Sequence, residues 1–134
     1  MSKEAERKQR GGQAILDGEP VWLTSVRQGF AKVTALEDNW DGEGASRIAP
    51  AMLERAMKAL EQLLPRHASP PNIVPTHRAG IQFEWHRGGK DLEIELAPSG
   101  ETTYYYYDAA TQDEREGAAA SDLSNVRKIL EQIV

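Results

Sequence analysis

The period of the apolar residues changes near residue 80, and this change constrains the fold more than any other feature. In residues 81–86 and again in residues 91–96, every second residue is apolar. Such alternation is typical of a β-strand with one buried face, and the letters RGGK between the two segments indicate a hairpin turn. After a second turn at 98–101, the letters TTYYYYD at 102–108 predict a third strand. The sequence therefore predicts an antiparallel meander with one apolar and one polar face.

Apolar residues elsewhere recur every three or four positions, which is typical of amphipathic helices. We expect a first helix that starts at Val21 and ends before Asn39, and a second helix that starts at Pro50 and ends at Pro65. A last helix is expected after Ser121, which should cap it. Its predicted inner face consists of Leu123, Val126, Ile129, Leu130 and Ile133.

The segments between these elements are predicted to be irregular. In the proline-rich connection before the meander, only Ile73 and Val74 indicate a short edge strand. Residues 109–120, which mix charged and small side chains, are expected to form a loop. His67 and His77 match no metal-binding spacing, so we expect both on the surface.

These elements predict an α+β fold with two layers. Helices are expected to cover the apolar face of an antiparallel β-meander of three or four strands, in the order α-α-β-β-β-α. A chain of 134 residues is long enough for one domain with its own core. We expect residues 15–134 to form this single domain and residues 1–14 to form a flexible charged tail.

Composition excludes several classes of function. The chain has no cysteine, which excludes disulfides, thiolate metal sites and a cysteine nucleophile. Lys and Arg number 16 against 21 Asp and Glu, and the net charge of −5 disfavours binding to nucleic acid or to anionic membranes. Residues 1–12 are charged, and no apolar run approaches the ~20 residues that span a bilayer, so we expect a cytoplasmic protein.

The letters EDNWDGEGAS at 37–46 form the most unusual stretch, and they raise the question of a calcium loop. An EF-hand with Gly42 at its sixth position would have Ile48 at its twelfth position, and a frame set on Gly44 would have Pro50 there. Neither residue supplies the bidentate carboxylate that closes the calcium cage. The stretch therefore does not match an EF-hand.

A structural role explains this stretch better. Asp-Gly and Glu-Gly pairs at 41–44 favour tight turns, because glycine adopts positive φ without strain. We expect Trp40 to pack inward beneath the loop, since a lone tryptophan beside a helix usually does so. The alternative interpretation makes Trp40 an exposed anchor for a partner protein.

The stretch NWDGEGAS, the helical LERAMKAL and the letters PPNIVPTHRAGIQFEWHRGGKDLEIEL together resemble a set of small, uncharacterised bacterial proteins. Those proteins carry a similar W-D-G-x-G-A stretch, a proline-flanked isoleucine and a G-I-x-x-E-W strand. The likeness covers about residues 37–97. It implies a bacterial origin and an α+β fold, and it brings no activity, cofactor or catalytic residue with it.

The polar face of the predicted sheet is the main candidate for a binding site. In the tyrosine run, alternate residues share a face, so one pair joins the core and the other lies outside. Exposed tyrosines favour a protein interface, whereas a flat exposed face lacks the pocket that catalysis needs. The candidate partner-binding residues are Tyr104, Tyr105, Tyr106, Tyr107, Glu84, His86, Glu93, Glu95 and Trp40.

The sequence thus predicts a non-enzymatic, acidic protein–protein interaction module of a bacterial cell. Inhibitors, antitoxin or immunity proteins and accessory subunits are the expected types, with another protein as partner and no cofactor, nucleic acid or membrane. A homodimer formed by pairing edge strands stays open. The alternative is a small-ligand- or metal-binding protein that uses Asp38, Asp41 and Glu43 of the 37–46 loop together with His86 of the polar sheet face.

Overall fold

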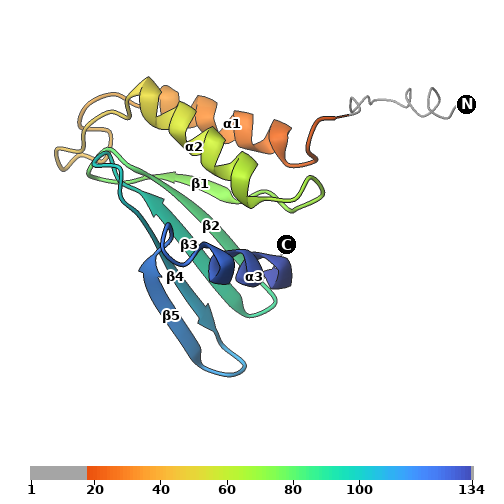
Figure 1. Cartoon of the computed structure of the whole chain (residues 1–134). Helices are drawn as coiled ribbons and strands as arrows, with labels where there is room; N and C mark the ends of the chain where they lie inside the picture. The colour runs from red at the N-terminus through yellow and green to blue at the C-terminus, as the bar shows by residue number, and fades with distance from the viewer. Residues whose placement is uncertain (1–17, 134) are drawn as a thin grey trace, which may run out of the picture.

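Helices and strands follow one another in the order α-α-β-β-β-β-β-α in the computed structural model, which describes residues 18–133 (Figure 1). The elements are α1 (Leu23–Thr34), α2 (Pro50–Leu63), β1 (Asn72–Pro75), β2 (Ile81–Arg87), β3 (Lys90–Leu96), β4 (Thr102–Asp108), β5 (Asp113–Ala118) and α3 (Leu123–Ile133). The predicted α+β class is confirmed. The predicted tail, residues 1–14, lies outside the described residues.

The sheet is a simple antiparallel meander in which each strand pairs with its neighbour along the chain, in the order β1-β2-β3-β4-β5. Strands β2, β3 and β4 bury every second residue, as the alternation predicts. The expected short strand at Ile73 and Val74 is confirmed as β1, at one edge of the sheet.

The prediction of a loop at 109–120 is wrong, because β5 lies within that segment. Its backbone pairs with β4 from Thr103 opposite Ala118 to Asp108 opposite Asp113. The letters DEREGA show no apolar alternation, since the inner position next to Tyr106 is occupied by a guanidinium group and not by an apolar side chain. The meander therefore has five strands and not three or four.

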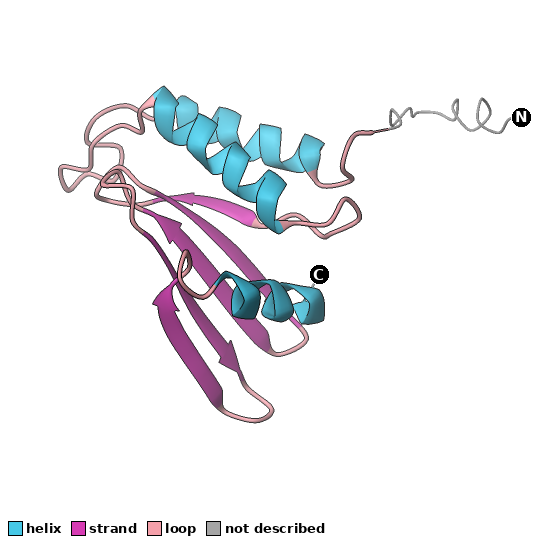
Figure 2. Ribbon diagram, in the orientation of Figure 1, coloured by secondary structure: helices cyan, strands magenta, loops and turns pink. Residues whose placement is uncertain are grey.

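All three helices cover the same face of the sheet and leave the opposite face bare, as Figure 2 shows. Buried side chains from both layers form one cluster, to which an aromatic or aliphatic residue contributes about 1.5–3 kcal/mol by burial. The helices supply chiefly Val26, Phe30, Val33, Met52, Ala56, Leu60, Val126, Ile129, Leu130 and Ile133, and the sheet supplies Ile81, Phe83, Trp85, Leu92, Ile94, Leu96, Tyr104 and Tyr106.

The start of α3 differs from the sequence prediction in two details. The hydroxyl of Ser121 donates to the carbonyl of Ala118 at 3.3 Å, and the helix begins two residues later at Leu123. Asp122 therefore directly precedes the helix, and its carboxylate accepts a hydrogen bond from the Tyr104 hydroxyl at 2.5 Å. Leu123 is 36% exposed, so the buried face of α3 begins at Val126.

Candidate functional site

The 37–46 loop is held by hydrogen bonds to its own backbone. One carboxylate oxygen of Asp41 accepts from the backbone N–H groups of Glu43 at 2.9 Å and Ala45 at 3.1 Å. The other oxygen lies 2.7 Å from Nδ1 of His77 in the turn between β1 and β2. These hydrogen bonds, with His77 as the largest cause, lower the pKa of Asp41 to about 2. Asp41 thus joins the loop to the sheet.

Two further polar side chains of the loop serve the same purpose. The side-chain oxygen of Asn39 accepts from the Gly44 N–H at 2.7 Å, and Asp38 accepts from the Arg47 N–H at 3.0 Å. Gly42 and Gly44 have φ of 76° and 87°, which the turn requires and which other residues rarely adopt. Residues 18–133 bring together no group of three or more His, Asp or Glu side chains that could hold a metal ion.

Trp40 lies between the two predicted extremes. It is half-buried, and its indole N–H donates to the carbonyl of Ser46 at 3.1 Å across the loop. The inward packing expected for Trp40 is found instead at Trp22 and Trp85, which are 1% and 2% exposed. Trp40 therefore braces the loop and does not join the core cluster.

The bare side of the sheet, called the outer sheet face below, carries a concentration of negative charge. The strand register aligns Gln82 with Glu95 and Glu84 with Glu93 on adjacent strands, as the alternation predicts. Six carboxylates occupy outward positions: Glu84, Asp91, Glu93, Glu95, Glu114 and Glu116. No Lys or Arg occupies an outward position in the five described strands. The face is therefore more acidic than the chain as a whole.

The structure decides which tyrosines face outward. Tyr104 and Tyr106 are 4% and 3% exposed because they lie against Ile94 and Leu92 on the inner face, and this burial raises the pKa of both. Their rings therefore lie on the inner side of the sheet and are not presented on its outer face. Tyr105 and Tyr107 lie half-buried on the outer sheet face.

Tyr105 is held in place by a neighbouring strand. Its hydroxyl donates to the carboxylate of Glu114 at 2.6 Å, and this hydrogen bond is the main cause that raises the pKa of Tyr105 to about 12. An ordered aromatic ring loses little conformational entropy when a partner covers it. Tyr105 thus has the properties of a rigid contact residue.

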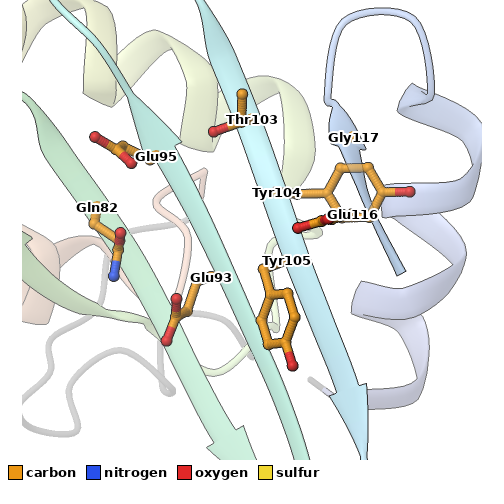
Figure 3. A pocket seen from close by; sticks show the side chains of 8 residues that line it. All are labelled: Gln82, Glu93, Glu95, Thr103, Tyr104, Tyr105, Glu116 and Gly117. Atoms are coloured by element: carbon orange, nitrogen blue, oxygen red, sulfur yellow. The ribbon is translucent and has the colours of Figure 1, made fainter. Parts of the chain in front are cut away.

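An open hollow of about 420 Å³ lies beside Tyr105 on this face (Figure 3). The side chains of Glu93 and Glu95 border it on β3, Thr103 and Tyr105 lie along β4, and Glu116 closes it on β5. Its lining is completed by Gln82, Tyr104 and Gly117. The hollow suits a protruding polar or cationic group better than an enclosed organic ligand.

His86 is the one basic side chain at an outward position in the described strands, and two carboxylates contact it. Its Nδ1 lies 2.7 Å from Asp91, and its Nε2 lies 3.2 Å from Glu84. These contacts, with Asp91 as the larger cause, raise the pKa of His86 above its ordinary 6.5. The imidazolium therefore persists on this face to higher pH than in a free histidine.

We expect a proton NMR titration of His86 to give a pKa above 6.5, and Asp91→Asn to lower that pKa because it removes the nearer negative charge. The raised pKa means that this contact contributes stability fully below pH 6.5, and that the contribution is lost as pH rises through the pKa of the folded state. Glu54→Gln on α2 is the control and should leave the titration unchanged. A pKa of 6.5 or below in the unsubstituted protein would contradict the arrangement.

Comparison with known proteins identifies no relative of this chain. No protein-family model, curated protein or solved structure matches the chain. Within residues 18–133, none of the helices combines the length and the apolar character that crossing a membrane requires.

Sequence reasoning identified part of this surface and missed the rest. Glu84, His86, Glu93 and Glu95 share the outer sheet face as predicted. The carboxylates of β5 are not among the predicted site residues, because the sequence predicts a loop in that segment. The acidic residues at 114 and 116 do have a period of two, which is the one signal in the sequence that could have revealed them.

Proposed function

We propose that this protein is a non-enzymatic interaction module of a bacterial cell and that its outer sheet face binds another protein. One observation carries the proposal: a bare sheet face presents two tyrosines among six carboxylates and no lysine or arginine in the described strands. Tyrosine supplies large, stiff contact area at protein interfaces, and a surface of one charge sign selects a partner of the opposite sign. An inhibitor, an antitoxin or immunity protein, or an accessory subunit would use such a face.

The rigidity of the sheet supports this proposal. Binding groups that are fixed on strands meet a partner at a smaller cost in conformational entropy than groups on loops. The two outward tyrosines lie on β4, which is paired with β3 on one side and, from Thr103 to Asp108, with β5 on the other. The face is therefore preorganised for a partner of matching shape.

A small-ligand or metal site in the 37–46 loop has less support. Asp41 already accepts from backbone N–H groups of the loop and contacts His77, and Asp38 accepts from the N–H of Arg47, directly after the loop. A ligand there would compete with the hydrogen bonds that define the loop. His86, the other group of this alternative, lies on the outer sheet face between Asp91 and Glu84.

A homodimer formed through strand edges also has little support. Strand β1 has four residues and ends at Pro75, which has no N–H to donate. Strand β5 at the other edge carries Asp113, Glu114, Arg115 and Glu116. A short strand with proline and a strongly charged strand both oppose edge-to-edge pairing.

Purification of the tagged protein from its host, with light scattering of the product, tests the proposal. We expect one stoichiometric partner protein, and we expect Tyr105→Ala/Tyr107→Ala to weaken its binding by about tenfold or more, as loss of central aromatic contacts does. Val21→Ala/Leu123→Ala is the matched control, because these apolar side chains are exposed outside the sheet. Equal retention of the partner by the tyrosine variant, or a monomer or homodimer with no partner, would refute the proposal.

A further inference from the structure

Two neighbouring rows of the outer sheet face repeat one order of side chains: carboxylate, tyrosine, carboxylate. Across β3, β4 and β5, one row consists of Glu93, Tyr105 and Glu116, and the next row consists of Asp91, Tyr107 and Glu114. Neighbouring strands lie ~4.8 Å apart, so each ring has a carboxylate-bearing strand on both sides. The two rows are two residues apart along each strand, which corresponds to ~6.7 Å.

A tyrosine ring between two carboxylates suits arginine more than any other side chain. The guanidinium plane stacks on an aromatic face, and its fork of N–H donors pairs with carboxylate oxygens. A lysine ammonium supplies the charge but neither the plane nor the fork. The order of side chains in the rows therefore favours arginine in particular, whereas a negative potential alone would attract any cation.

The inner face of the same hairpin already contains this combination. The guanidinium carbon of Arg115 lies 5.9 Å from the centroid of the Tyr106 ring, and its nitrogen binds Asp113 at 2.8 Å. Arg115 also donates to Asn125 of α3 at 3.0 Å, which keeps it on the inner side. On the outer side the described residues contribute the tyrosines and the carboxylates but no arginine.

The carboxylates of the first row have no competing contacts within residues 18–133. Neither Glu93 nor Glu116 forms an ion pair or a side-chain hydrogen bond with another described residue. Glu93 instead lies directly opposite Glu84 on β2, and like charges in such a cross-strand pair are destabilising. A cation from a partner would remove this repulsion, and the hollow beside Tyr105 has room for it.

We infer that the outer sheet face recognises a partner protein through arginines at alternate positions of an extended segment, with one guanidinium seated in the hollow among Glu93, Tyr105 and Glu116. Alternate residues of an extended chain lie ~6.7 Å apart on one side, which equals the spacing of the two rows. A segment parallel to β4 thus places successive arginines in successive rows. This inference rests on the proposed function and names the chemistry of the partner.

Titration calorimetry of the full chain with two synthetic peptides tests the inference. One peptide contains RTRTRT, and the other contains the isomer TTTRRR, so both have the same charge and composition. We expect the alternating peptide to bind about tenfold more tightly at physiological salt, because only its arginines match the rows. A third peptide, KTKTKT, should bind more weakly than RTRTRT, because its ammonium groups do not stack on the rings.

Matched variants of the protein separate this recognition from general charge attraction. We expect Glu93→Gln/Glu116→Gln and, separately, Tyr105→Leu to weaken binding of RTRTRT by about tenfold. Glu54→Gln/Glu61→Gln removes the same charge from the exposed side of α2 and should change the affinity less than twofold. Circular dichroism would verify that each variant is folded.

Three results would overturn the inference: no binding of RTRTRT, equal binding of its isomer, or an equal loss in the α2 control. The proposed function has its own readout, the copurified partner. If that partner is lost with Tyr105→Ala/Tyr107→Ala while the peptides are not distinguished, the interface stands and the arginine pattern is wrong. If the partner is retained, the proposed function itself fails.

Discussion

Replacement of Trp85 by alanine is expected to lower the free energy of unfolding by about 3–5 kcal/mol. The side chain is 2% exposed, its indole N–H donates to the carbonyl of Ser69 at 3.1 Å, and its ring meets Phe83 edge to face with 6.4 Å between centroids. The substitution leaves a cavity and an unpaired carbonyl at the junction of sheet and helices. Urea denaturation followed by circular dichroism would measure the loss.

Trp40→Ala is the matched control for this prediction. Trp40 is half-buried, and its indole N–H donates to Ser46 of the same loop, so we expect a loss of about 1 kcal/mol. The difference between the two variants tests which tryptophan belongs to the core. Equal losses would contradict the assignment of Trp40 to the loop. Since domains of this size are stable by about 5–15 kcal/mol, the Trp85 variant is expected to be marginally folded.

Gly80→Ala is expected to cost about 1–3 kcal/mol through overpacking. A Cβ atom at residue 80 would lie 2.6 Å from the carbonyl oxygen of Leu96 and 2.9 Å from Oγ1 of Thr76. The first contact is with backbone, so the strands themselves must move apart where Ile81 pairs with Leu96. This close approach explains why glycine precedes the first long strand. Denaturation midpoints of the purified variant would measure the effect.

Gly117→Ala provides the comparison within the same sheet. A Cβ atom there would lie 3.5 Å from the ring of Tyr104, an ordinary contact distance. Because alanine also reduces the conformational freedom of the unfolded chain, we expect no loss or a gain of a few tenths of a kcal/mol. A loss at Gly117 as large as that at Gly80 would mean that close packing at Leu96 is not the cause.

The sequence predicts the residues of the candidate site only in strands where apolar residues fall at every second position and polar residues fall between them. There the apolar residues occupy one of the two alternating positions, called one phase. Within each of the segments 81–86 and 91–96 the apolar residues occupy one phase, and this alternation alone assigns Glu84, Glu93 and Glu95 to the polar face. The tyrosine run has equal residues in both phases, so its sequence could not select a face. The register with β3, which pairs Tyr104 with Ile94 and Tyr106 with Leu92, selects it.

The fifth strand was not predictable from hydrophobic alternation. Its inner side is covered only in part, and Arg115 lies there over Tyr106 in place of an apolar residue. Backbone pairing with β4 and the contact with Asn125 of α3 define the strand. Both are contacts with other elements, which the apolar period within one segment does not contain. They are what places the two outward carboxylates of this strand in the candidate site.

The sequence predicts the fold class, the positions of the helices and the central strands, and the polarity of the outer sheet face, because these follow from local periods of apolar residues. It also predicts that Gly42 and Gly44 form turns. The packing of the elements is needed to establish the fifth strand, the exposed tyrosine pair and the half-buried place of Trp40. The first two depend on backbone pairing between neighbouring strands, and the third depends on the hydrogen bond of Trp40 to Ser46. A local period of apolar residues contains none of these contacts.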